Sequence, residues 1–209
     1  MKTQKSLKNY LDELSSNSPT PGGGNVSALC GVLASSLGVM VCNLTIGKKK
    51  YLEFEQEAKD LILILEAFKN DFLTLADKDN LSFDKVMEAF KLPKESDEQK
   101  TLRKEAIDKA TMEAAIVPAD VINKCKDLLP MLELIAEKGN QNSLSDAGVA
   151  ISLTSTAAEG AFLNVAINCS GLSNQTEAAE FLKNAESIYE DIKKKKNQII
   201  SKIILKMKS

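Results

Sequence analysis

Residues 26–46 read VSALCGVLASSLGVMVCNLTI, and no charged residue interrupts them. The stretch is long enough for a membrane span. However, Ser, Gly and Asn residues dilute it, so it holds only about half of the strongly apolar residues that a span of ~20 residues needs. Small residues recur at helical spacing, at Ser27, Gly31 and Ser35, and would let a second helix approach closely. The stretch therefore predicts a central helix of a soluble helical bundle.

A second stretch has the same character. Residues 147–170 carry Glu159 as their only charge and are again rich in Gly and Ala. Small side chains allow two helix backbones to pack closely. We predict that the two stretches form a central pair of helices, either within one subunit or across a homodimer.

The remaining sequence shows helical spacing and helix-ending residues, without the alternating pattern of a half-buried strand. Amphipathic patterns predict helices over residues 7–14, 51–92, 101–117 and 174–208. Pro93 ends the second of these, and a charged linker follows over residues 94–100. Pro118 and Pro130 predict breaks that separate two shorter helices, and Gly139 ends the last of them. The expected fold class is all-α, with a single helical-bundle domain over residues 1–209.

Composition excludes several classes of function. The 209 residues include 27 Lys and Arg and 29 Asp and Glu, so the net charge of −2 disfavours nucleic-acid binding. The absence of histidine excludes Ser-His-Asp triads, imidazole general bases and histidine-ligated metals. Four widely separated cysteines predict reduced, buried thiols rather than disulfides or a zinc site. From the same residues we expect no bound metal, and the diluted 26–46 stretch predicts no membrane contact. Because the first residues lack the apolar core of a secretory signal, we expect a cytoplasmic protein.

A glycine-rich loop precedes the first uncharged helix. Gly22, Gly23, Gly24 and Asn25 follow two prolines and lead into a helix N-terminus, where free backbone N–H groups favour an anionic or carbonyl ligand. A helix entry without any ligand would have the same sequence. The loop is therefore a candidate binding segment with a purely structural alternative.

Three lysines follow the same helix at its other end. Lys48, Lys49 and Lys50 come directly after Gly47, which is a typical helix-ending residue. The lysines would complement the negative end of the helix dipole, or they would contact an acidic substrate.

Two acidic residues, Asp77 and Asp79, end a strongly apolar helical pattern. Residues two apart do not share a helix face, so only one of the two carboxyl groups is expected to point inward. A carboxyl group buried beside aromatic side chains has a raised pKa and can exchange protons near neutrality. A solvated helix turn is the alternative.

A polar cluster covers residues 139–146. Asn140 and Asp146 would offer donors and acceptors to a heterocycle with amide-like edges, although helix capping alone also explains the cluster.

Five motifs of this chain resemble one known family. They are PTPGGGNVSAL at residues 19–29, NLTIGKKKY at 43–51, LPK at 92–94, GN with SDAGVA within 139–150, and NVAIN at 164–168. They follow the order and spacing of the formiminotransferase-cyclodeaminase C-terminal family and span essentially the whole chain. The resemblance implies an all-helical homodimer that acts on one-carbon units of tetrahydrofolate.

The resemblance implies one of two reactions. A formiminotetrahydrofolate cyclodeaminase closes the 5-formimino group onto N10 and expels ammonia, which gives 5,10-methenyltetrahydrofolate. A methenyltetrahydrofolate cyclohydrolase opens that ring with water and gives 10-formyltetrahydrofolate. We expect the cyclodeaminase, with the cyclohydrolase as the alternative. A catalytically inactive folate-binding dimer and a membrane-associated bundle are the competing classes.

The resemblance also implies roles for particular residues. The family's acid/base is the second aspartate of an Asp-x-Asp-x-x-x-Phe pattern, which here makes Asp79 the catalytic residue, with Asp77 and Phe83 beside it. The expected substrate contacts come from the glycine loop, the polar cluster and the lysines that would meet the glutamate carboxylates of a tetrahydrofolate with one or more glutamates. These residues are Gly22, Gly23, Gly24, Asn25, Lys48, Lys49, Lys50, Asn140 and Asp146. We expect no cofactor beyond the tetrahydrofolate substrate.

The chain departs from the family pattern at two positions. Asn25 stands where the family usually has Ser, and Ser82 stands where it commonly has Ala. The formiminotransferase domain of bifunctional relatives is also missing from this sequence, so we expect an enzyme that works without it.

Overall fold

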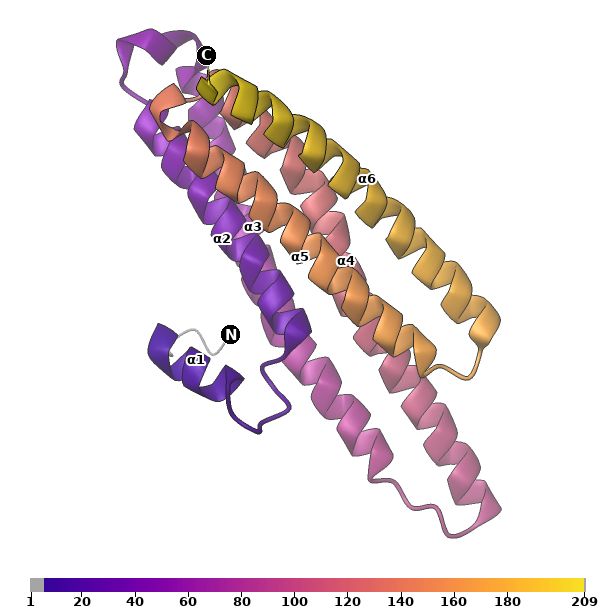
Figure 1. Ribbon diagram of the computed structural model, residues 1–209. Coiled ribbons are helices and arrows are strands. Elements are labelled where there is room, and N and C mark those ends of the chain that lie inside the picture. Colours follow the sequence, from indigo (N-terminus) through magenta and orange to yellow (C-terminus); the bar gives the residue numbers. More distant parts are fainter. Residues whose placement is uncertain (1–5, 209) are drawn as a thin grey trace.

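The computed structural model describes residues 6–208 and builds them entirely from helices, turns and loops (Figure 1). The six α-helices are α1 (Leu7–Leu14), α2 (Gly23–Thr45), α3 (Glu55–Phe90), α4 (Asp97–Lys138), α5 (Leu144–Ser170) and α6 (Gln175–Lys208). Two short 3₁₀ helices lie at Lys49–Phe54 and Gln141–Ser143. The predicted all-α class is confirmed.

Helices α2 and α5 lie side by side at the centre of the bundle and run in opposite directions (Figure 1). A Cβ atom added at Gly160 of α5 would lie 2.3 Å from the Ser27 hydroxyl of α2. On another side of α2, a Cβ atom added at Gly31 would lie 2.5 Å from the Phe72 ring of α3. The small residues therefore bring the backbones together, and the predicted central pair of helices exists within one chain.

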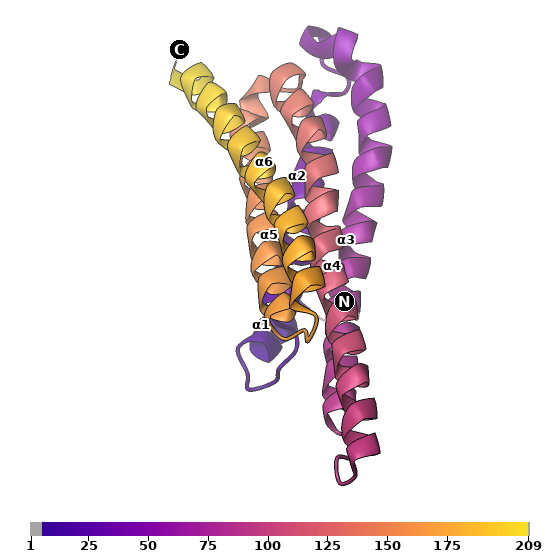
Figure 2. The same ribbon diagram turned by 90° about the vertical axis from the view of Figure 1, so that its right-hand side faces the viewer.

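Helices α3 and α4 form a long hairpin that projects beyond the other helices (Figure 2). Phe72 of α3 packs beside Gly31 and Asp79 beside Gly24, so α3 runs antiparallel to α2. The last turns of α3 consequently extend past the first residue of α2. Helix α6 packs along α4 and α5. The N-terminus of α2 thus faces the space between the projecting hairpin and α1 (Figure 1).

The prediction of helix breaks at Pro118 and Pro130 was wrong, because both prolines lie inside the continuous helix α4. A proline inside a helix removes one N–H donor and leaves the carbonyl four residues earlier without its partner. For Pro118 this is the carbonyl of Ala114, and the side-chain amide of Asn168 on α5 donates to it over 3.0 Å. Pro130 lies on the exposed side of the helix, where water can serve the freed carbonyl.

The predicted linker over residues 94–100 was too long. Helix α4 begins at Asp97 with a capping box, in which the Ser96 hydroxyl accepts from the Gln99 backbone and the Gln99 side chain accepts from the Ser96 backbone. These reciprocal bonds satisfy donors at the helix start. The same Ser-x-x-Gln spacing is present in the sequence and could have located the N-terminus.

Two helical segments, α2 and residues 141–170, have the length and apolar composition of a membrane-spanning helix. About half of each apolar stretch is buried against other helices of the bundle. Fully buried side chains such as Leu65, Leu128 and Ile151 continue this core through α3, α4 and α5. The core position of both stretches agrees with the bundle interpretation of the sequence.

Candidate active site

The carboxyl group of Asp79 lies directly against the first turn of α2. A Cβ atom added at Gly24 would lie 2.1 Å from Asp79 Oδ1 and 2.7 Å from its Cγ, which is closer than atoms can approach. The backbone N–H of Asn25 donates to the carboxylate. Glycine at position 24 therefore lets a carboxyl group from α3 reach the free N–H groups at the start of α2.

Two opposing effects act on the pKa of Asp79. Burial raises it, because the charged form loses water, and the hydrogen bond from Asn25 lowers it. Burial is the larger effect, so the pKa of Asp79 lies above its usual value. A carboxyl group in this state can both accept and release a proton closer to neutrality than an exposed aspartate can.

The sequence left open which of the two acids, Asp77 or Asp79, points inward. The geometry shows Asp79 against the glycine loop, and Asp77 is half-buried two residues before it. Because the two positions are about 200° apart around a regular helix, only one of them can face α2.

A second layer of hydrogen bonds fixes Asn25 itself. The Tyr10 hydroxyl of α1 donates to Asn25 Oδ1 over 2.9 Å, and Asn25 Nδ2 donates to the carbonyl of Ala76 on α3 over 2.8 Å. Both side chains are buried, with Asn25 only 1% exposed. The side-chain amide thus links α1, α2 and α3. These bonds fix the position of Asn25, whose backbone N–H donates to the Asp79 carboxylate. The sequence predicted Asn25 as a substrate contact, and its position shows an internal link as well.

Two further polar side chains near the site had no predicted role. Asn164 of α5 lies beside Gly23, where an added Cβ atom would be 3.4 Å from Asn164 Nδ2. Asn80 follows Asp79, and within the described residues its buried Oδ1 has no hydrogen-bond partner. An unpaired buried acceptor is costly, so this oxygen stands out among the buried polar atoms of α3. Only the position of Asn80 next to Asp79 could have indicated it from sequence.

The predicted lysines and the polar cluster lie at the opposite end of α2. Lys48, Lys49 and Lys50 are exposed just after its C-terminus, where Gly47 has a φ angle of +76° and ends the helix. The backbone N–H of Asn140 donates to Thr45 Oγ1 over 2.9 Å.

Both polar atoms of the Asn140 side chain are engaged within the protein. Its Nδ2 donates to the carbonyl of Leu44, and its Oδ1 accepts from the backbone of Asn142. Asp146 follows in the first turn of α5, so it lies at this end as well. The capping interpretation of this cluster is consistent with these bonds.

The predicted site residues therefore form two groups within one chain. Helix α2 has 23 residues, which corresponds to about 33 Å at ~1.5 Å per residue. Gly22–Asn25 and Asp79 lie at its start, whereas Lys48–Lys50, Asn140 and Asp146 lie near its end. A single chain does not bring the two groups into contact with one small molecule.

The cysteines do not contribute a second reactive centre. All four thiols are free, and only Cys30 is partly exposed. Burial raises the pKa of every one of them, that of Cys42 to about 11, which keeps them protonated and unreactive. Three of the four thiols are buried as predicted, whereas Cys30 is only partly buried. Within residues 6–208, no three His, Cys, Asp or Glu side chains are grouped to hold a metal ion.

Comparisons with known proteins agree on the family and include proteins named for two different reactions. The family model described as formiminotransferase-cyclodeaminase matches residues 6–187. The chain is 38% identical to a methenyltetrahydrofolate cyclohydrolase of Methylorubrum extorquens, over 94% of this chain and 100% of that protein. It is 32% identical to the formimidoyltransferase-cyclodeaminase of Mus musculus, over 78% of this chain but only 30% of that protein. The crystal structure of a formiminotetrahydrofolate cyclodeaminase from Thermotoga maritima matches with a TM-score of 0.81 and 34% identity, over 97% of this chain and 98% of that one.

Proposed function

Because the chain belongs to the formiminotransferase-cyclodeaminase family, we propose that it is a formiminotetrahydrofolate cyclodeaminase in which Asp79 is the general acid/base. The observation that supports this proposal is the position of Asp79. Its carboxyl group lies half-buried against the glycine loop, receives an N–H from α2 and has a raised pKa. A folate enzyme without histidine needs such a carboxyl group to move protons.

The proposed reaction uses one proton twice. N10 of the substrate attacks the carbon of the protonated 5-formimino group, and a bond between N10 and that carbon forms. The Asp79 carboxylate takes the proton that N10 loses, which leaves a tetrahedral carbon between N5 and N10. The same proton then passes to the former imino nitrogen. The carbon–nitrogen bond breaks, ammonia leaves, and the methenyl group carries the positive charge while Asp79 is again a carboxylate.

The glycine loop would hold the pterin part of the substrate close to Asp79. Gly22 and Gly23 have no side chains, so their backbone groups at the start of α2 can approach a flat ring. Free N–H donors at a helix N-terminus suit the carbonyl and ring nitrogens of a pterin. We expect no cofactor beyond the tetrahydrofolate substrate, and a cytoplasmic location, where folate intermediates are used.

A cyclohydrolase is the second candidate, and the match to the Methylorubrum extorquens protein favours it. That protein is named a methenyltetrahydrofolate cyclohydrolase, and its whole length aligns with this chain. In this reaction Asp79 would take a proton from the water that attacks the methenyl carbon. Both reactions pass through a tetrahedral carbon between N5 and N10, so the same carboxyl group serves either.

The test is a pair of steady-state assays that follow the methenyl chromophore. Its appearance from 5-formiminotetrahydrofolate, together with released ammonia, supports the cyclodeaminase. Its accelerated loss from 5,10-methenyltetrahydrofolate, without the first activity, supports the cyclohydrolase instead. If neither rate exceeds the uncatalysed rate, tetrahydrofolate binding should be measured by calorimetry, and binding without turnover would replace the enzyme proposal with the folate-binding dimer.

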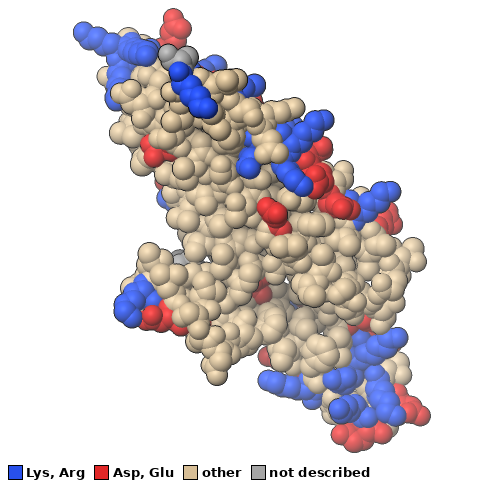
Figure 3. Space-filling model, viewed as in Figure 1, with Lys and Arg blue, Asp and Glu red and all other residues tan. Residues whose placement is uncertain are grey.

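We also propose that the protein is a homodimer in which a second copy covers the outer face of α2 and α5. Large apolar side chains are exposed there, among them Leu33 on α2 and Leu163 and Ile167 on α5, the last at 68% exposure. Few charged side chains lie on the surface over α2 and α5 in the view of Figure 3. An antiparallel second copy would also bring its own Lys48–Lys50 end toward the Asp79 end, which would unite the two groups of predicted site residues.

Light scattering tests this arrangement. Ile167→Glu should shift the protein from dimer to monomer, because it introduces a charge into the covered face. Leu63→Glu is the matched control, since Leu63 is similarly exposed, at 73%, on α3. A monomeric wild-type protein, or an equal effect of the two variants, would contradict the arrangement.

A further inference from the structure

Asn164 of α5 lies against the first turn of α2, close to Asp79. A Cβ atom added at Gly23 would lie 3.4 Å from Asn164 Nδ2 and 3.8 Å from its Oδ1. A Cβ atom added at Gly24 would meet the Asp79 carboxyl group. The two glycines are consecutive, so their Cα atoms are about 3.8 Å apart. A carboxyl group from α3 and an amide from α5 therefore flank the same helix start.

One hydrogen bond fixes the orientation of the Asn164 amide. Its Nδ2 donates to the carbonyl of Gly160, one turn earlier on α5, over 2.8 Å. The flipped amide would place two oxygen atoms against each other, so Oδ1 is the atom left for a ligand. No donor within residues 6–208 reaches Oδ1, and the side chain is half-buried rather than enclosed. The structure thus offers a ligand an oriented hydrogen-bond acceptor at this place.

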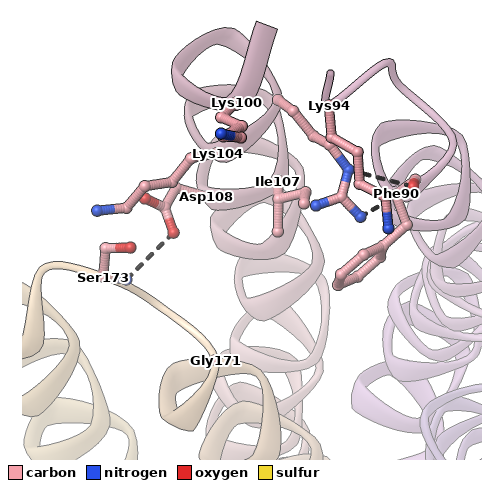
Figure 4. Close-up of a pocket in the computed structure, with 9 residues that line it drawn as sticks. Phe90, Lys94, Lys100, Lys104, Ile107, Asp108, Gly171 and Ser173 are labelled. Carbon is pink, nitrogen blue, oxygen red and sulfur yellow. Dashed lines mark hydrogen bonds between the residues drawn. The ribbon is translucent and has the colours of Figure 1, made fainter. Parts of the chain in front are cut away.

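This part of α5 is held from two sides. Toward α2, a Cβ atom added at Gly160 would lie 2.3 Å from the Ser27 hydroxyl, and that hydroxyl donates to the carbonyl of Gly23 over 2.7 Å. Toward α4, the backbone N–H of Ser173, just after α5, donates to the Asp108 carboxylate over 3.1 Å at the pocket shown in Figure 4. These contacts keep the amide at a fixed place beside Gly23, as a group that orients a reacting atom requires.

An acceptor at this place suits the two candidate substrates unequally. The 5-formimino group carries a nitrogen with N–H donors, whereas the reacting carbon of 5,10-methenyltetrahydrofolate carries only a hydrogen outside the ring. A hydrogen bond from a protonated formimino nitrogen to an amide oxygen is charge-assisted and therefore stronger than a neutral one. An acceptor beside the reacting carbon can distinguish the two substrates, which Asp79 cannot do because it serves either reaction.

We propose that Asn164 is the residue that selects the formimino substrate, an assignment that rests on the proposed function. Asn164 Oδ1 accepts a hydrogen bond from the formimino nitrogen, while Asp79 takes the proton of N10. The hydrogen bond holds that nitrogen in place as the bond between N10 and the carbon forms. Because the nitrogen uses one N–H toward Asn164, its lone pair remains open to the proton that Asp79 returns before ammonia leaves.

The binding of two ligands that differ at one atom tests this selection. 5-Formyltetrahydrofolate has a carbonyl oxygen, which is an acceptor, where 5-formiminotetrahydrofolate has its N–H donor. Calorimetry measures both in the Asp79→Asn protein, in which turnover is slow. The formimino ligand should bind about 10-fold or more tightly than the formyl ligand. Adding Asn164→Leu should reduce this ratio to below about 2-fold, because leucine has a similar size and no acceptor.

Two further variants in the same background separate an acceptor from a structural role. Asn164→Asp keeps an oxygen acceptor but loses the donor to the Gly160 carbonyl, so it should keep the preference for the formimino ligand. Thr74→Val is the matched control, since it removes a hydrogen bond to the carbonyl four residues earlier on the exposed side of α3. It should leave the ratio unchanged. A preserved ratio in Asn164→Leu, or an equal loss in Asn164→Asp or Thr74→Val, would overturn the assignment.

Turnover separates this assignment from the proposed function. In the single variant Asn164→Leu, kcat/KM for 5-formiminotetrahydrofolate should fall about 10-fold or more, whereas kcat/KM for 5,10-methenyltetrahydrofolate should change by less than about 3-fold. Equal losses would count against the selection. A wild type without cyclodeaminase turnover overturns the proposed function, whereas normal turnover with a ligand ratio that ignores Asn164→Leu overturns the role of Asn164 alone.

Discussion

Replacing Asp79 by Asn is the substitution that separates catalysis from folding at this site. The amide keeps the shape of the carboxyl group beside Gly24, and its oxygen can still accept from the Asn25 backbone. It cannot take a proton from N10 or from water. We expect turnover to fall by about 10²-fold or more, which corresponds to about 2.7 kcal/mol in activation free energy.

The same substitution should not reduce the free energy of unfolding at neutral pH. Burial raises the pKa of Asp79, so its stabilising contribution is present below the unfolded-state pKa and is lost as the pH rises through the folded-state pKa. Above the folded-state pKa the wild type has therefore lost this contribution. The amide that replaces the carboxyl group is neutral at every pH and carries no such loss.

The pH profile provides a second readout. A base must be deprotonated, so kcat/KM of the wild type should fall as the pH drops through the raised pKa of Asp79, above the usual value of 3.8. The residual activity of Asp79→Asn should lack this acid limb. Steady-state assays across pH, with urea unfolding of both proteins, measure these quantities.

A matched control is Asp84→Asn, which removes an exposed carboxylate from the same helix. It should leave turnover, the acid limb and stability near those of the wild type. Near-normal turnover in a folded Asp79→Asn protein would refute the acid/base assignment. An equal loss in Asp84→Asn would show that the effect comes from the charge of the helix rather than from proton transfer.

Three further substitutions test the support of the site. Gly24→Ala should displace the proposed catalytic carboxylate and reduce kcat by ~10-fold or more in a folded protein, whereas Gly148→Ala on α5, where the added Cβ atom has its nearest neighbour 3.7 Å away, should leave kcat unchanged; equal kinetics of the two variants would disprove the close approach at Gly24. Tyr10→Phe leaves the Asn25 amide oxygen buried without a donor and should cost about 1–3 kcal/mol in urea unfolding; no loss would mean that water replaces the hydroxyl. Asn168→Ala should reduce the free energy of unfolding by a similar ~1–3 kcal/mol, because it removes the donor to the Ala114 carbonyl of α4 that Pro118 leaves without a helical partner. Calorimetric melting measures this loss, and an unchanged melting temperature would mean that water hydrates the carbonyl instead.

Local pattern was sufficient for most of the fold. The uncharged stretch at residues 26–46 and the amphipathic period after residue 51 correspond to α2 and α3, because burial and helix period are both visible in the order of residues. The interior prolines of α4 were not predictable in this way. The amide of Asn168 that compensates for Pro118 comes from a helix about fifty residues later, and nothing in the local sequence of α4 shows it.

The site was partly predictable for the same physical reason. Helix geometry limited the inward-facing acid to one of two, and the family resemblance selected Asp79, which the structure shows against the glycine loop. The distance between the glycine loop and the Lys48–Lys50 segment was also available from sequence, since a continuous helix of that length separates its own ends by about 33 Å. The roles of Tyr10 and Asn25 as a linked pair depend on where α1 folds, which only the tertiary structure shows.

The first turn of α2 explains how one carboxyl group could serve in both directions of proton transfer. A general acid/base works best when its pKa is close to the working pH, and an exposed aspartate is far too acidic for this. Burial against Gly24 raises the pKa of Asp79, while the N–H of Asn25 and the positive end of the helix dipole limit the rise. A larger residue at position 24 would push the carboxyl group away and remove both effects at once. The glycine therefore sets the proton affinity of Asp79 through geometry, which is a way to tune an acid/base in a chain that contains no histidine.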